Sequence, residues 1–130
     1  MKNKIFVYIL FVLFITQAYA NESNRNQTSS VPSTVQFEII QSELTAKITL
    51  KIDKFSGNVF QLVTGKEGLT WQLISKEKHS KDKAFSSKVN YQLFTSGLAV
   101  RLTFLINVNT GATWQLAEDN EIGAFWKALE

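Results

Sequence analysis

Apolar and polar residues alternate with a period of two through much of the chain beyond Val35. In the first half of the chain the apolar set is Ala46, Ile48, Leu50 and Ile52, separated by Lys47, Thr49, Lys51 and Asp53. In the second half Val100, Leu102, Phe104 and Ile106 alternate with Ala99, Arg101, Thr103 and Leu105. This period is typical of strands with one face toward a core and the other toward solvent. The pattern therefore predicts an all-β protein.

The pattern of the first half recurs about 54 residues later. When 35–63 is placed over 89–117 without a gap, eight of 29 positions are identical, whereas chance at ordinary composition gives roughly two. One inserted residue in the second loop then aligns Trp71 with Trp126. We interpret this as a tandem duplication. The aligned pairs Leu50/Phe104, Ile52/Ile106 and Leu62/Leu116 are predicted to form the scaffold.

Each unit is predicted to contribute four antiparallel strands. The expected ranges are 35–41, 44–53, 58–64 and 69–75 in the first unit, and 89–95, 98–107, 112–117 and 124–129 in the second. The stretch 119–129 also fits a short capped helix, but the alignment of Trp126 with Trp71 favours a strand. We expect the two meanders to pack together as a sandwich or a two-blade-like arrangement.

Both units place the same turn signal between their second and third strands, at Asp53–Gly57 and Asn107–Gly111. An Asp or Asn side chain accepts hydrogen bonds from the backbone N–H groups two and three residues on, and a Ser or Thr assists. The glycine supplies the positive φ that the exit position requires. We therefore expect a hairpin turn at each segment.

The N-terminus predicts a cleavable secretory signal peptide at 1–20. Lys2 and Lys4 precede an apolar run from Ile5 to Ile15, and Ala18-Tyr19-Ala20 offers the small residues that a signal peptidase recognises. The run is short for a transmembrane anchor, and no basic stop-transfer cluster follows it. We expect cleavage after Ala20, an exported protein that is periplasmic or extracellular and bacterial, and no membrane insertion after cleavage.

The remaining chain is predicted to comprise a flexible lead-in at 21–34 and a β-domain at 35–130. Within the β-domain, a basic linker at 76–88 joins the repeats 35–75 and 89–129. This linker is rich in lysine and lacks an apolar stripe, which favours a solvated segment over an anionic docking strip.

Charge and residue content exclude several kinds of function. The formal net charge is +3, but removal of Lys2 and Lys4 leaves 12 basic and 11 acidic residues, so we expect no nucleic-acid partner. There is no cysteine, and His79 is the single histidine. Disulfides and the usual N/S metal sites are therefore not expected. No catalytic constellation is recognisable, and the chain is predicted to be neither an enzyme nor a cofactor-binding protein.

The segments Ile52–Leu62 and Ile106–Leu116 carry a resemblance to known sequences. They resemble the repeated D/N-x-x-S/T-G-x-x-F/W-Q-L β-hairpins of small exported bacterial proteins of unassigned function. The resemblance covers roughly half of the mature chain and implies a β-meander. A more distant likeness is to propeller-blade repeats, but a closed propeller requires about four blades or more, and only two repeats are present.

Four residues are candidate partner contacts: Phe55, Asn109, Trp71 and Trp126. Phe55 is an apolar ring at a turn tip where the second unit has Asn109. Large aromatics on strands of a small domain more often fill the core, but Trp71 and Trp126 would also suit a binding platform. We expect an exported, non-enzymatic protein-interaction module, such as an inhibitor, immunity or envelope accessory protein. The alternative is a module that binds a glycan or another small ligand through exposed aromatics.

Overall fold

The computed structural model describes residues 33–42, 48–96 and 98–130. The predicted signal peptide at 1–20, residues 21–32 of the predicted lead-in and residues 44–47 of the predicted second strand lie outside the described residues.

The described chain is all-β, as the alternation predicted. The first half contains β1 (Phe37–Gln41), β2 (Thr49–Asp53), β3 (Asn58–Gly65) and β4 (Gly68–Lys76), and the second contains β5 (Tyr91–Phe94), β6 (Phe104–Asn107), β7 (Thr113–Asp119) and β8 (Gly123–Leu129). The stretch 119–129 thus forms the end of β7, a turn and a strand, not a helix. The predicted strand at 98–107 is partly wrong, because Val100–Leu102 forms the 3₁₀ turn η1 and pairing begins at Phe104.

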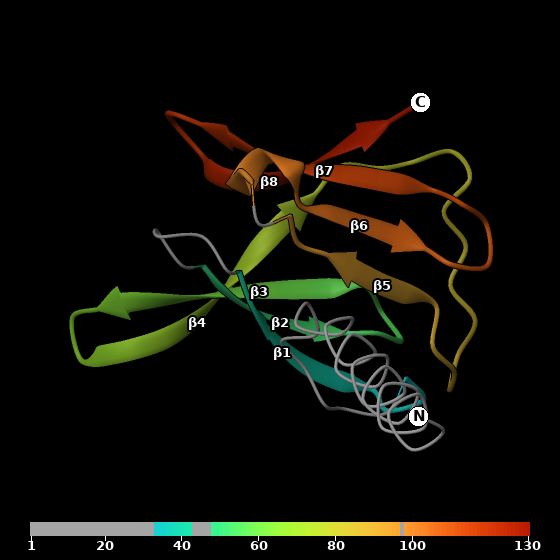
Figure 1. Ribbon diagram of the computed structural model, residues 1–130, viewed down its shortest axis with the longest axis horizontal. Helices are drawn as coiled ribbons and strands as arrows, with labels where there is room; N and C mark the ends of the chain where they lie inside the picture. Colours follow the sequence, from blue (N-terminus) through green and yellow to red (C-terminus); the bar gives the residue numbers. More distant parts are fainter. Residues whose placement is uncertain (1–32, 43–47, 97) are drawn as a thin grey trace, which may run out of the picture.

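The eight strands form one sheet in the order β1-β2-β3-β4-β8-β7-β6-β5. Neighbours are antiparallel except β4 and β8, which run parallel and pair through Ser75–Lys76 and Phe125–Trp126. The sheet curls, so that the second half folds over part of the first (Figure 1). The predicted packing of two separate meanders is therefore wrong in this respect: a seam of backbone hydrogen bonds joins the halves into a single curled sheet.

The order of the strands decides which side of each half faces the core. The last strands of the two halves are parallel neighbours, and the other strands follow in reversed order on either side of them. Superimposing one half on the other therefore requires a half-turn rotation about an axis parallel to the strands. This rotation exchanges the two faces of the sheet. Because side chains alternate between the two faces of a strand, aligned positions of the two halves lie on opposite sides of the sheet.

Burial follows this geometry at every strand. The core residues of the first half are Ile40, Leu50, Ile52, Val59 and Ile74, and those of the second half include Leu93, Leu105, Trp114, Leu116 and Trp126. Among the predicted scaffold pairs, Leu50 and Ile52 are fully buried, but their counterparts Phe104 and Ile106 are only half-buried. The expectation that both members of each pair form the scaffold is wrong, because only one member can face inward.

The two predicted hairpin turns are confirmed in detail. Asp53 Oδ1 accepts the N–H groups of Phe55 (3.0 Å) and Ser56 (3.4 Å). In the second turn Asn107 Oδ1 accepts the N–H groups two and three residues on, at 3.0 and 3.2 Å. Gly57 and Gly111 share a φ of +76°. The same chemistry recurs before β8, where Asp119 Oδ1 accepts two N–H groups.

Candidate interaction surface

An apolar face covers the side of the first half that turns away from the core. We call it the first outer face, and it consists of Phe37, Ile39, Lys51, Phe60, Leu62, Trp71 and Leu73. Strand register places Ile39, Lys51, Phe60 and Leu73 in one row across β1 to β4, with Leu62 opposite Trp71 beside it. Phe37, Ile39 and Leu73 are each more than half exposed. The arrangement is a broad apolar surface built on rigid strands.

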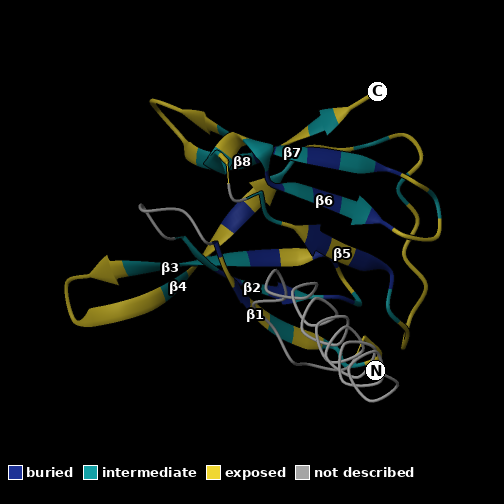
Figure 2. Cartoon of the chain, viewed as in Figure 1, coloured by how far each residue is buried: buried dark blue, intermediate teal, exposed yellow. Residues whose placement is uncertain are grey.

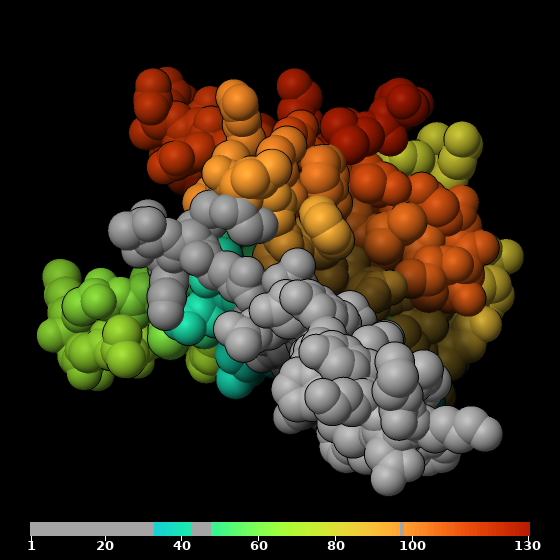
Figure 3. Space-filling view, viewed as in Figure 1, coloured from blue at the N-terminus to red at the C-terminus, as the bar shows by residue number. Residues whose placement is uncertain are grey.

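The β3–β4 hairpin carries this face beyond the rest of the sheet. β4 pairs with β8 only through the last two residues of β4. Before that point β4 and β8 diverge, and the β3–β4 hairpin projects from the rest of the protein (Figures 1 and 3). Its outer half is exposed on both sides, from Thr64 to Thr70 (Figure 2). Leu69, near the tip, is 72% exposed. Together with Phe37, Ile39 and Leu73, Leu69 makes an exposed apolar surface of the kind that is typical of an interaction site.

Lys51 lies at the centre of the first outer face. Its ammonium nitrogen is 4.8 Å from the ring centroid of Phe60 and 4.7 Å from that of Trp71. Both contacts are cation–π interactions, which are strongest where water is excluded. The aliphatic stem of the lysine adds apolar surface between the two rings. The face therefore has a single positive charge set among aromatic groups.

The predicted contact residues lie in three different environments. Trp71 is half-buried on the first outer face, whereas Trp126 is 0% exposed in the core. Trp126 is therefore not available as a surface contact. The physical reason is the exchange of faces: the aligned tryptophans lie on opposite sides of the curled sheet, and only that of the second half faces inward.

The structure brings the turns of Phe55 and Asn109 together around Asn90. This buried asparagine donates from Nδ2 to the Phe55 carbonyl oxygen (2.9 Å) and accepts at Oδ1 from Asn109 Nδ2 (2.9 Å). Its backbone N–H donates to the carbonyl of Lys54. Phe55 is half-buried and Asn109 is exposed. The pair belongs to a hydrogen-bonded junction between the two turns.

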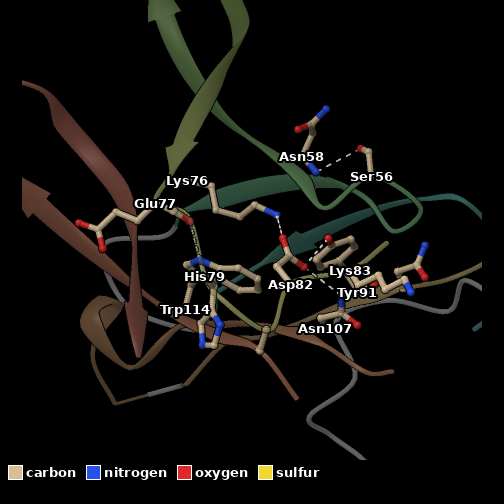
Figure 4. A network of polar contacts seen from close by, with 12 residues as sticks. Ser56, Asn58, Lys76, Glu77, His79, Asp82, Lys83, Tyr91, Asn107 and Trp114 are labelled. Carbon is tan, nitrogen blue, oxygen red and sulfur yellow. Dashed lines mark hydrogen bonds and ion pairs between the residues drawn. The ribbon is translucent and has the colours of Figure 1, made fainter. Parts of the chain in front are cut away.

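A polar network docks the segment after β4 onto the sheet (Figure 4). Asp82 Oδ1 accepts from the Tyr91 hydroxyl (2.7 Å) and Asn107 Nδ2 (3.0 Å), and Oδ2 pairs with Lys76 Nζ (3.2 Å). Burial raises the pKa of Asp82, but these hydrogen bonds and the charge of Lys76 outweigh burial and bring the pKa below its usual value. Burial and the carboxylate raise the pKa of Tyr91. The predicted basic linker is thus anchored by its aspartate.

His79 also contacts the sheet. Its ring packs edge-on against Trp114, with centroids 5.3 Å apart. Nδ1 accepts the N–H of Lys81, so Nε2 carries the hydrogen directed at the Leu129 carbonyl oxygen, 2.9 Å away. In the part of the chain that the structure describes, no three His, Asp or Glu side chains gather as metal ligands. The contacts of Asp82 and His79 therefore have a structural role. Both carboxylate oxygens of Asp82 already accept from donors within the protein.

Sequence reasoning missed most of the first outer face. It singled out Trp71 but not Ile39, Phe60 or Leu73. A signal was present in β1 and β4, where apolar residues occupy both alternating positions, as in Ile39-Ile40 and Leu73-Ile74. A strand with apolar residues on both sides needs cover on both sides.

Over residues 33–42, 48–96 and 98–130, no helix has the length and apolar character needed to span a bilayer. No protein-family model, curated protein or solved structure matches this chain.

Proposed function

We propose that this protein is an exported, non-enzymatic interaction module that binds another protein through the first outer face. The observation that carries the proposal is the row Ile39–Lys51–Phe60–Leu73, which lies on the outside with Ile39 and Leu73 more than half exposed, although its aligned row in the second half faces the core. Burying a large apolar side chain contributes about 1.5–3 kcal/mol. A face that leaves several such side chains in water is best explained by a partner that covers it.

The details of the face favour a protein partner over a glycan. A sugar would stack on an open indole ring, but one face of Trp71 is occupied by the Lys51 ammonium. The other two tryptophans, Trp114 and Trp126, are 0% exposed. Aliphatic side chains such as Ile39 and Leu73 suit the apolar centre of a protein interface. The glycan-binding alternative therefore has less support.

The tandem repeat is part of the proposal. Two halves with the same strand order, the same turn chemistry and aligned sequences are what duplication of one β-meander would produce. In such a protein each meander has two faces that bear apolar side chains, and the curled sheet buries one face of each meander in the core. The first outer face is then the unused face of the first repeat.

Photo-crosslinking in the producing cells tests the proposal. A photoreactive residue at Leu73 lies on the first outer face, and one at Gln72, its exposed neighbour, points to the opposite side of the same strand. We expect protein adducts from position 73 and few from position 72, identified by mass spectrometry. Equal yields at both positions, or no adduct at either, would contradict the proposal.

Export is tested separately by the mass of the protein recovered outside the cytoplasm. We expect an N-terminus at Asn21, because the small residues before it match a signal-peptidase site. Recovery of the intact 130-residue chain from that fraction would contradict cleavage, whatever the crosslinking result.

A further inference from the structure

A second, partly apolar face lies on the outside of the second half. This second outer face consists of two rows of residues. Register places Phe94, Phe104, Gln115 and Lys127 in one row across β5 to β8, and Gln92, Ile106, Thr113 and Leu129 in the row beside it. The rings of Phe94 and Phe104 pack 6.4 Å apart, and Phe94 is still 60% exposed. Each half therefore has one face in the core and one outside that also bears large apolar side chains.

The two outer faces correspond in sequence to two faces that already pack together inside the chain. The inner face of the first half (Ile40, Leu50, Ile52, Val59, Ile74) aligns with Phe94, Phe104, Ile106, Thr113 and Leu129. The inner face of the second half (Leu93, Leu105, Trp114, Leu116, Trp126) aligns with Ile39, Lys51, Phe60, Leu62 and Trp71. The second outer face therefore corresponds to the inner face of the first half, and the first outer face corresponds to the inner face of the second half. Those two inner faces pack against each other in the core.

We infer that the partner of the first outer face is a second copy of this chain, which covers it with its second outer face. The contact repeats between copies the packing that joins the two halves within one copy. The inference rests on the proposed function, because it names the protein bound at that surface. Each copy offers one face of each kind, so the contact is head-to-tail. Two copies that make it twice close as a dimer, and otherwise copies extend into a ring or filament.

Lys51 sets the strength of this association. It occupies the position that Leu105, 0% exposed, fills in the core of the second half. Its ammonium has the Phe60 and Trp71 rings as partners, which lowers the penalty of covering the charge, but a buried ammonium still costs more than a leucine. The lysine therefore keeps the contact reversible, and Lys51→Leu should strengthen it.

Sedimentation velocity of the chain expressed from its full sequence tests the inference. We expect association that rises with concentration between about 1 µM and 1 mM. Leu73→Asp on the first outer face and Phe94→Asp on the second should each raise the dissociation constant at least about tenfold, and Lys51→Leu should lower it about tenfold. The matched control is Ile122→Asp, which places the same charge at an exposed apolar turn residue off both faces and should change nothing.

Mixing the two disrupted variants identifies the head-to-tail geometry. The Leu73→Asp chain keeps an intact second outer face, and the Phe94→Asp chain keeps an intact first outer face. We expect the mixture to form a one-to-one heterodimer through the single contact that remains. Loss of association by Leu73→Asp alone, with no recovery on mixing, would indicate pairing of like faces and would overturn the inference.

A chain that stays monomeric throughout the concentration range would also overturn it. Crosslinking from Leu73 then separates the two proposals. Adducts with a different protein would leave the proposed function standing and reject self-association, whereas adducts with the chain's own residues would assign the cover to the same molecule. Absence of any adduct would reject both.

Discussion

The two halves of this protein have the same strand order and aligned sequences, yet they place opposite faces in the core. Leu50 is fully buried and its counterpart Phe104 is only half-buried, whereas Trp126 is fully buried and its counterpart Trp71 lies half-buried on the outer surface. The cause is topological: parallel pairing of β4 and β8 turns the second half over relative to the first. Positions that align in sequence therefore need not share burial, and a curled sheet made of two such halves leaves one face of each outside.

The aligned tryptophans give the largest expected difference between the halves. Trp126→Ala should cost about 3–5 kcal/mol, because it empties a fully enclosed site. Trp71→Ala should cost about 1–2 kcal/mol, because the ring is only half-buried on an outer face, where it contacts Lys51. Urea unfolding of both variants measures the two values. Equal losses would show that the two faces are buried alike and would contradict the exchange of faces.

The two turn glycines give the next largest difference. Both have a φ of +76°, so an alanine at either position should cost about 1 kcal/mol in backbone strain. At Gly57 a Cβ would also meet the ring of Tyr91 at 2.9 Å, whereas at Gly111 it would meet nothing within 4 Å. Overpacking adds about 1–3 kcal/mol. Gly57→Ala should therefore destabilise the protein by about 2–4 kcal/mol, and Gly111→Ala by about 1 kcal/mol.

Thermal unfolding of the two alanine variants checks this difference. The matched backbone angle makes Gly111→Ala the control for strain, so the excess at Gly57 measures the contact with Tyr91. If the two variants melted together, β5 would not lie against the first turn as the structure places it.

Local features of this fold were predictable from the sequence, and the pairing between distant strands was not. Over the described residues, period-two patterns located the eight strands within a few residues, apart from the starts of β2 and β6, and the Asx turns formed as their side chains required. The parallel seam of Ser75–Lys76 with Phe125–Trp126 depends on residues 50 apart. No local pattern encodes that pairing, and without it the inward face of the second half is undetermined.

The same gap explains what was missed at the candidate site. Trp71 is conspicuous by residue type, but its neighbours Ile39 and Phe60 join it only through strand register. Phe55 looked exposed because turn tips usually are, whereas the approach of β5 to the first turn, through Asn90, half-buries it. Surfaces built from several strands need the sheet order before they can be recognised.

Asp53 in the first half and Asp82 in the segment that joins the halves should respond differently to loss of charge. Asp82→Asn should cost about 1–3 kcal/mol at neutral pH, because Lys76, Tyr91 and Asn107 all donate to it. Asp53→Asn should cost less than about 1 kcal/mol, because Asn107 holds the equivalent turn with an amide oxygen. Urea unfolding at neutral pH measures both. A larger loss at Asp53 would contradict the role of Asp82 as the anchor of the segment after β4.

The pH dependence of stability identifies the charge of Asp82 as the cause. Its pKa in the folded protein is lowered, although burial acts in the opposite direction. Its contribution is therefore complete above the unfolded-state value of about 3.9 and is lost as the pH falls through the lower folded-state value. Wild type should lose stability more steeply below about pH 4 than Asp82→Asn does. Parallel curves for the two proteins would show that the carboxylate contributes no net stability.

The smallest expected difference is between Phe55 and Asn109, the residues at equivalent places in the two turns. Phe55→Ser retains the backbone N–H bonded to Asp53 and the carbonyl bonded to Asn90, and the ring is only half-buried. We expect it to cost less than about 1 kcal/mol. Asn109→Ser removes the donor to Asn90 Oδ1 and should cost about 1 kcal/mol, so the exposed polar residue should matter slightly more than the aromatic one. Melting temperatures of the two variants decide the order. A large drop for Phe55→Ser would show that its ring seals the junction between the turns, and stability there would then depend on the first half more than on the second.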